Sequence, residues 1–183
     1  MSRLERAKFK IKHIGILSRF KAKELPFKYD IIIVLSGPEP QRSLLEQILI
    51  QEFLNFKGTV LMVRGLFKNE PDLRISESFN SINYLIGDQL QDAIIQSKLV
   101  ISRSGYSTIM DLAVLGKKAF FIPTPSQKEQ LYLAKRMKKL GIAPSCFQHE
   151  FTTEKLKQIE NFKGFSVSKP ELNLNLFRLF NSK

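Results

Sequence analysis

The segment from Val100 to Asp111 is the part of this 183-residue chain that most restricts its fold. A short β-branched stretch is followed at once by the turn Arg103-Ser104-Gly105 and then by residues with helical spacing. Such a strand, turn and helix point several backbone N–H groups and the positive end of a helix dipole at one spot beyond the strand. That spot suits the diphosphate of a nucleotide, and Asp111 could then accept a hydrogen bond from a ribose hydroxyl.

Strand and helix patterns alternate from about residue 30 onward. The run from Asp30 to Leu35 is β-branched and almost continuously apolar, as in a strand that is buried on both faces of a parallel sheet. This alternation predicts right-handed βαβ units and an α/β fold with a doubly wound, Rossmann-like parallel sheet. We expect strands at 30–35, 59–63, 82–86, 99–102 and 118–122, and helices at 43–56, 88–96, 107–115, 128–140, 152–161 and 171–180.

The loops after the predicted strands are the expected place for a ligand site, because ligands of such sheets bind beyond the carboxyl ends of the strands. These loops are residues 36–42, 64–68, 103–107 and 123–130, and we expect them to share one edge of the sheet. The polar stretch 68–79 contains Pro71 and is predicted to be a loop that includes at most a short strand.

The net charge of +12 is concentrated in residues 1–28, which carry nine Lys or Arg and two acidic residues. Such a segment can bind nucleic acid, an anionic membrane or a charged partner, and it can equally be a solvated linker. Composition leaves these alternatives open. The single cysteine, Cys146, excludes an internal disulfide, and the sequence has neither a zinc-site spacing nor an apolar stretch of membrane-spanning length. We therefore expect a cytoplasmic protein without a metal.

A longer signature surrounds the opening motif. The segment Ser102–Ala143 resembles the C-terminal, donor-binding domain of the two-domain GT-B glycosyltransferases. It is most similar to the glycosyltransferase family 28 C-terminal domain. This group contains the peptidoglycan N-acetylglucosaminyltransferase and the catalytic subunit of the eukaryotic dolichol-linked N-acetylglucosaminyltransferase. The matching residues are Arg103, Ser104, Gly105, Thr108, Asp111, Gly116, Pro123, Glu129, Gln130, Ala134 and Gly141.

The resemblance implies a single GT-B half-domain over residues 29–183, preceded by a basic interdomain connector over 1–28. It also implies a UDP-sugar donor as substrate, with no cofactor and no metal. Asp111 would bind the ribose hydroxyls, Glu129 and Gln130 the sugar, and the backbone around 87–90 would lie near the uracil. The implied substrate-binding residues are Ser36, Gly37, Arg103, Ser104, Gly105, Tyr106, Ser107, Thr108, Asp111, Glu129 and Gln130.

Two departures from the family pattern affect this interpretation. The first loop reads Ser-Gly-Pro-Glu-Pro over 36–40, with fewer glycines than is usual, and Asp111 stands where the family usually has Glu. Several residues also have simpler roles open to them. Asp111 could complement the helix dipole, Ser107 or Thr108 could be an N-cap, and Gln130 could be solvated. Arg103 could pair with a phosphate or with a neighbouring acid, and packing is the role favoured for Tyr106.

The resemblance further implies a hexosyltransferase that is inactive as this chain alone. The catalytic base is unknown and is expected outside this chain, on an N-terminal acceptor domain or a separate acceptor-binding subunit, because neither His13 nor His149 lies in a motif. The enzyme would work at the inner face of the membrane, with peripheral contact to anionic lipid through basic residues. The alternatives are a non-catalytic nucleotide-binding module, a nucleotide-sugar epimerase fragment and a basic nucleic-acid-binding protein.

Overall fold

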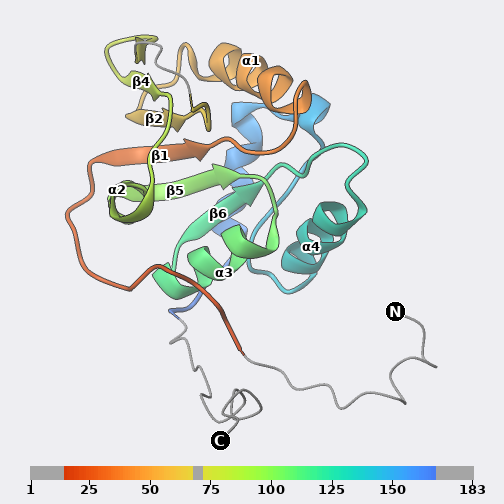
Figure 1. The fold of residues 1–183 in the computed structure, drawn as a ribbon. Helices are drawn as coiled ribbons and strands as arrows, with labels where there is room; N and C mark the ends of the chain where they lie inside the picture. Colours follow the sequence, from red (N-terminus) through yellow and green to blue (C-terminus); the bar gives the residue numbers. More distant parts are fainter. Residues whose placement is uncertain (1–14, 68–71, 168–183) are drawn as a thin grey trace, which may run out of the picture.

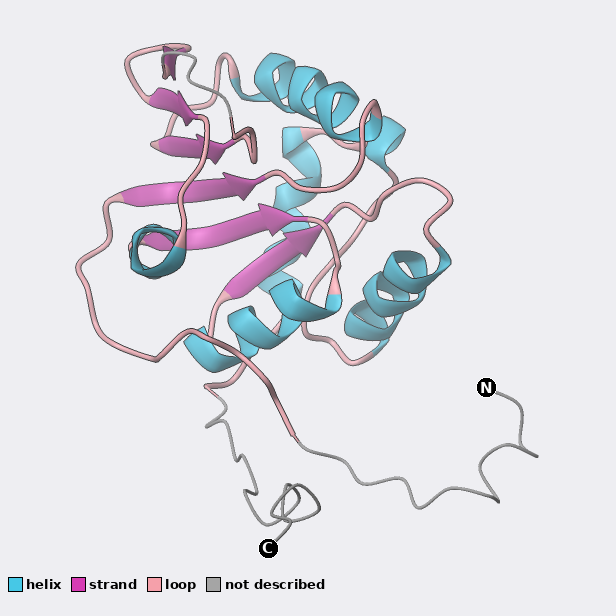
Figure 2. Cartoon of the chain, viewed as in Figure 1, coloured by secondary structure: helices cyan, strands magenta, loops and turns pink. Residues whose placement is uncertain are grey.

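The computed structural model describes residues 15–67 and 72–167. A six-stranded sheet in the order β3-β4-β2-β1-β5-β6 forms its centre (Figures 1 and 2). β3 is antiparallel to β4 at one edge, and the other five strands are parallel. The strands are β1 (Tyr29–Val34), β2 (Val60–Val63), β3 (Leu73–Arg74), β4 (Phe79–Ile82), β5 (Ser97–Ser102) and β6 (Lys118–Phe121).

Helices cover both faces of the sheet, which confirms the predicted doubly wound α/β fold (Figure 1). On one face, residues of α2, α3 and α4 pack on side chains such as Ile32 and Val100. On the other face, α1 and the 3-10 helix η2 pack near Ile31, Ile33 and Phe120. The helices are α1 (Gln41–Phe53), α2 (Gly87–Ile95), α3 (Tyr106–Leu115), α4 (Lys128–Lys139), η1 (Gln148–Glu150) and η2 (Thr153–Asn161).

The buried β-branched residues of the central strands explain this arrangement. Ile32 and Ile33 of β1 are fully buried, because they point to opposite faces and each face is covered by helices. In the register of the sheet, Ile32 lies opposite Leu61 of β2 and Val100 of β5. Burial of such side chains stabilises the sheet by roughly 1.5–3 kcal/mol for each one that leaves water completely.

One strand lies elsewhere than the sequence predicts. The expected strand 82–86 is wrong, because β4 spans Phe79–Ile82. Its parallel register places Phe79 opposite Val60 of β2, where its ring packs edge-on against Phe53 at 6.3 Å. Beyond the last paired residue, the side chains of Tyr84 and Ile86 are exposed. Tertiary packing of Phe79 therefore decides the position of this strand. The two-residue β3 agrees with the prediction that the stretch 68–79 is a loop with at most a short strand.

The helices follow the predictions with smaller differences. α1 begins two residues earlier than expected and ends three earlier, and the segment 153–161 is a 3-10 helix, not an α-helix. Gly116 ends α3 in the left-handed conformation, with φ of 63°, as its position in the sequence indicates. The predicted helix 171–180 lies outside the described residues, as do residues 1–14 of the basic segment.

Candidate functional site

The carboxyl ends of the parallel strands bring the expected loops to one edge of the sheet. β1 is flanked by β2 on one side and by β5 on the other. The chain therefore continues to one side of the sheet after β1 and to the opposite side after β5. The gap between β1 and β5 is therefore the topological switch point, where doubly wound sheets bind ligands. The loop 35–40 after β1 and the turn 103–105 after β5 flank this point. The prediction of a shared edge is confirmed.

The loop after β1 faces the loop after β6. Ser36 and Gly37 are both exposed, and Gly37 has φ of 105°, a left-handed conformation that favours glycine. A Cβ atom at Gly37 would lie 3.5 Å from the Oγ1 atom of Thr124. Thr124 itself is buried, so its side chain forms part of the floor on which the first loop rests.

The first turn of α3 offers its N–H groups to the same edge. Gly105 is the N-cap residue, and no hydrogen bond from a side chain caps this helix end in the described part of the chain. The alternative that Ser107 or Thr108 is a plain N-cap is therefore wrong. Tyr106 and Ser107 are exposed beside this helix end. An uncapped helix N-terminus with free N–H groups suits an anion, because the donors and the dipole both favour negative charge.

Asp111 lies one turn further along α3, on the wall of a cavity of about 470 Å³. It is the sixth residue of the helix, beyond the first turn in which a carboxylate interacts strongly with the dipole. Burial raises the pKa of Asp111, and the hydrogen bond from Ser18 and the charge of Arg19 partly oppose this effect. The cavity is lined by Leu17, Ser18, Arg19, Leu90, Ser107, Thr108 and Asp111.

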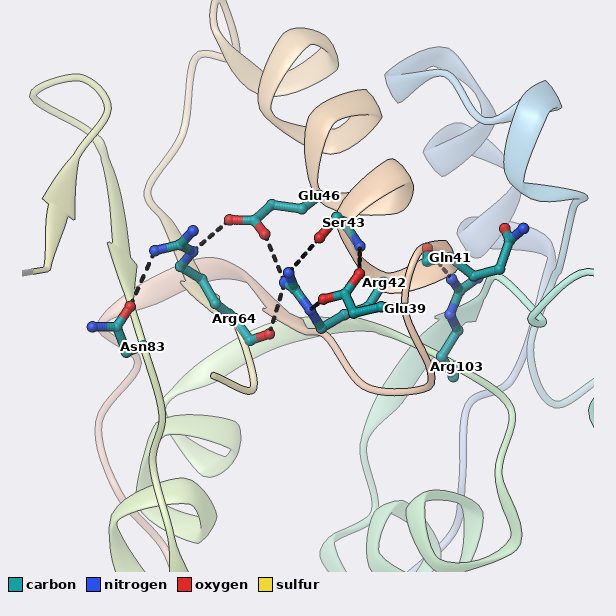
Figure 3. A network of polar contacts seen from close by, with 8 residues as sticks. All are labelled: Glu39, Gln41, Arg42, Ser43, Glu46, Arg64, Asn83 and Arg103. Atoms are coloured by element: carbon teal, nitrogen blue, oxygen red, sulfur yellow. Dashed lines mark hydrogen bonds and ion pairs between the residues drawn. The ribbon is translucent and has the colours of Figure 1, made fainter. Parts of the chain in front are cut away.

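Arg103 lies behind this edge and not in the cavity. Its side chain is 1% exposed, and its guanidinium donates to four protein acceptors (one of them drawn in Figure 3). These are the carbonyl oxygens of Ile122, Pro123 and Gln41, at 3.0, 3.3 and 2.9 Å, and Oε1 of Gln148, at 2.7 Å. Burial lowers the pKa of Arg103 to about 10, so the side chain is charged at neutral pH. Arg103 thus joins the start of α1, the end of β6 and η1.

Ser104 and Gln130 connect the starts of α3 and α4. The Ser104 hydroxyl donates to the carbonyl oxygen of Gln130 at 2.8 Å. The Gln130 side chain accepts from the Thr124 N–H at 2.8 Å and donates to Gln127 at 2.6 Å. These bonds hold the loop after β6 in place. Contact of Gln130 and the exposed Glu129 with a sugar stays a prediction.

A charged network at the end of the first loop has no counterpart among the predicted site residues (Figure 3). Glu46 is buried and accepts from Arg42 at 2.6 Å and from Arg64 at 2.5 Å. Arg64 follows β2 and also donates to Asn83, which follows β4, at 3.1 Å. Glu39 of the first loop pairs with Arg42 at 2.5 Å. The network therefore joins the ends of three strands, and the i, i+4 spacing of Arg42 and Glu46 was its signal in the sequence.

Fold and site together define a Rossmann-like domain of the GT-B type. Residues 31–161 match the glycosyltransferase family 28 C-terminal domain, and the chain belongs to this family. The resemblance seen in the sequence is thereby confirmed.

A relative from Sulfurihydrogenibium sp. (strain YO3AOP1) is a UDP-N-acetylglucosamine--N-acetylmuramyl-(pentapeptide) pyrophosphoryl-undecaprenol N-acetylglucosamine transferase. It is 28% identical over 138 residues, which cover 73% of this chain and 38% of that protein. The chain thus spans less than half the length of this relative.

Two solved structures show the same fold. The crystal structure of Acinetobacter baumannii MurG superposes with a TM-score of 0.62 at 17% identity, over 93% of this chain and 56% of that one. The solution structure of ALG13 superposes with a TM-score of 0.51 at 16% identity, over 87% of this chain and 95% of that one. In residues 15–67 and 72–167, no helix has the length and apolar character needed to cross a membrane.

Proposed function

We propose that this domain binds the UDP-sugar donor of a glycosyltransferase. The observation that carries the proposal is the position of Asp111. Its carboxylate lines a cavity of about 470 Å³ that also reaches Ser107 and Thr108 at the uncapped start of α3. A diphosphate at the helix N-terminus would place a ribose within reach of this carboxylate, as acidic residues bind ribose in other nucleotide sites.

The reaction would be transfer of a hexosyl group to an acceptor that an N-terminal domain or a partner subunit binds. The acceptor hydroxyl attacks the anomeric carbon, a base on that other half takes its proton, and the bond from the anomeric carbon to UDP breaks. The N–H groups of Tyr106, Ser107 and Thr108 would stabilise the charge that develops on the departing UDP. N-acetylglucosamine is the first sugar to test, because the relative from Sulfurihydrogenibium is an N-acetylglucosamine transferase.

Thermal unfolding in the presence of UDP, UMP or ADP tests which nucleotide the domain binds. A ligand at a hundredfold over its Kd adds about 2.7 kcal/mol to the free energy of unfolding, which raises Tm by roughly 5–10 °C for a domain of this size. We expect this shift with UDP, a smaller one with ADP, and a loss of UDP affinity of about 10- to 100-fold in Asp111→Ala, because a hydrogen bond to a charged group is lost.

The control for this experiment is Glu160→Ala, which removes an exposed carboxylate on η2 and should leave the UDP shift unchanged. Failure of every nucleotide to raise Tm would contradict the proposal. A shift with RNA and none with UDP would favour the nucleic-acid-binding alternative, since RNA would then be the ligand of the basic surface.

We also propose peripheral contact with anionic lipid at the inner face of the membrane, through α4 and the basic residues of 1–28. Lys135 and Lys138 are exposed on α4, beside a groove of about 430 Å³ whose lining includes Leu131, Phe147 and the acidic Glu150. Cations beside apolar side chains suit a phospholipid surface, where each lysine contributes about 1 kcal/mol.

The double variant Lys135→Gln/Lys138→Gln tests the lipid contact. Because two cations are lost, we expect binding to phosphatidylglycerol vesicles to weaken roughly 30-fold, as measured by co-sedimentation at low salt. Phosphatidylcholine vesicles are the matched control and should bind both proteins weakly. Equal binding of the double variant and the unchanged protein to the anionic vesicles would refute this contact.

A further inference from the structure

The described part of the connector, residues 15–28, is attached to the surface of α2 and α3. Phe20 is 3% exposed and belongs to the hydrophobic core. The Lys21 N–H donates to Oε1 of Gln91 at 2.8 Å, and Lys23 forms an ion pair with Asp92 at 2.5 Å. These contacts fix the chain immediately after Ser18, so the position of Ser18 relative to α3 is set by tertiary structure.

The hydroxyl of Ser18 forms a hydrogen bond with the carboxylate of Asp111. The Oγ atom donates to Oδ1 of Asp111 at 2.5 Å and accepts from the Phe20 N–H at 3.0 Å. A hydroxyl has one hydrogen, and the bond from Phe20 occupies an acceptor position of the same oxygen, so the hydrogen is directed at the carboxylate. An ionised carboxylate has about four acceptor positions. One bond from Ser18 therefore leaves Asp111 able to accept from two further hydroxyls on the cavity side.

We propose that Ser18 is a positioning residue of the nucleotide site, whose hydroxyl holds the Asp111 carboxylate in the orientation that accepts both hydroxyls of a ribose. This inference rests on the proposed function and adds the connector to the site. Ser18 and Asp111 line the same cavity, so the bond between them forms part of its wall. A carboxylate held in one orientation loses less conformational freedom when it binds, which favours affinity.

The surroundings of Asp111 make its charge sensitive to this bond. Asp111 also lines a second, small cavity of about 50 Å³, and burial raises the pKa of Asp111. Arg19 is the charged group that faces Asp111 from the connector, and the described linings from α2, α3, β1 and β5 add no charge besides Asp111 itself. The small cavity is lined by Phe20, Val34, Leu90, Ile94, Val100, Thr108, Asp111 and Leu112.

Removal of the Ser18 hydroxyl therefore has a defined effect on pH dependence. The hydrogen bond from Ser18 lowers the pKa of Asp111, so its loss raises that pKa further. A ribose bound to the ionised carboxylate is released as the pH falls through the pKa of the free carboxyl group. In Ser18→Ala, we expect UDP affinity to fall at a higher pH than in the unchanged protein.

The test is calorimetric titration of the full chain and of Ser18→Ala and Ser18→Thr with two ligands, UDP and 2′,3′-dideoxy-UDP. We expect Ser18→Ala to weaken UDP binding about tenfold at neutral pH, the scale of one charge-assisted hydrogen bond, and Ser18→Thr to restore it. The dideoxy nucleotide lacks the hydroxyls that Asp111 binds, so its weaker affinity should be the same in all three proteins. Amide NMR spectra check that each variant is folded.

The outcomes separate the two proposals. If the unchanged chain binds UDP and Ser18→Ala binds it equally well or more tightly, the role of Ser18 is overturned while the nucleotide site stands. An equal loss of both ligands in Ser18→Ala would also overturn it, because the effect would then be independent of the ribose hydroxyls. If the unchanged chain does not bind UDP, the proposed function fails, and this inference fails with it.

Discussion

Arg103→Met is expected to lower the free energy of unfolding by about 3–5 kcal/mol, because it leaves several buried acceptors without a donor and each costs about 1–3 kcal/mol. Arg103 supplies hydrogen bonds to the carbonyl oxygens of Ile122, Pro123 and Gln41 and to Gln148. Removal of the buried positive charge offsets part of the lost stability, because that charge no longer has to be kept out of water. The methionine side chain, however, cannot donate a hydrogen bond to any of the four acceptors. Urea unfolding, followed by circular dichroism, measures the change.

The matched control for this prediction is Arg136→Met. Arg136 is exposed on α4 and donates to the hydroxyl of Tyr132 at 3.1 Å. The same substitution there should change the free energy of unfolding by no more than about 0.5 kcal/mol, as is usual for surface positions. A loss below about 1 kcal/mol at Arg103 would mean that water or a rearranged side chain satisfies its acceptors, and that the guanidinium does not hold the three segments together.

Glu46→Ala has the second large expected effect, also about 3–5 kcal/mol of destabilisation. Glu46 is the carboxylate that Arg42 and Arg64 share, and Glu46 and Arg42 are both buried. Removal of Glu46 takes away the buried partner of Arg42 and leaves it the exposed Glu39, and loss of one partner from a buried ion pair costs far more than an exposed pair contributes. Urea is the suitable denaturant here, since guanidinium chloride would screen the charges.

Two comparisons make the Glu46 experiment specific. Glu160→Ala removes an exposed carboxylate and should change stability by no more than about 0.5 kcal/mol. The double variant Glu46→Leu/Arg42→Leu should recover part of the loss, because apolar replacement of a buried pair is often neutral or stabilising. If Glu46→Ala were as stable as the unchanged protein, the network would have to be solvated in solution.

Under the proposed function, Arg103 and the Glu46 network would compensate for the small number of glycines in the first loop. The first loop lies between these two groups of contacts, with Glu39 bound to Arg42 and the Gln41 carbonyl bound to Arg103. Both hold the end of the first loop, at Glu39 and Gln41. A loop that is already held in place loses little conformational entropy when it meets a ligand. A loop held by such contacts is an alternative to a glycine-rich loop, whose backbone can come close to the ligand.

The sequence predicted the fold closely because its signals are local. Buried apolar runs identify β1, β2, β5 and β6, and helical spacing identifies the helices that follow them. The misplaced β4 shows the limit of this approach. The apolar run at 82–86 has strand character, but pairing with β2 and packing of Phe79 on Phe53 place the strand at Phe79–Ile82. Burial of one aromatic side chain outweighs the modest strand preference of a short run.

The sequence by itself determined the order of the elements, the sheet edge at which the loops meet and the turn that starts α3, since each depends on neighbours within a few residues. Only the tertiary structure decided which distant partners the polar side chains have. Ser18 and Asp111 are 93 residues apart, and Arg103 is 62 residues from Gln41 and 45 from Gln148. A buried donor or acceptor must be paired wherever the fold brings a partner within about 3 Å. That requirement acts through space, and no local pattern in the chain encodes it.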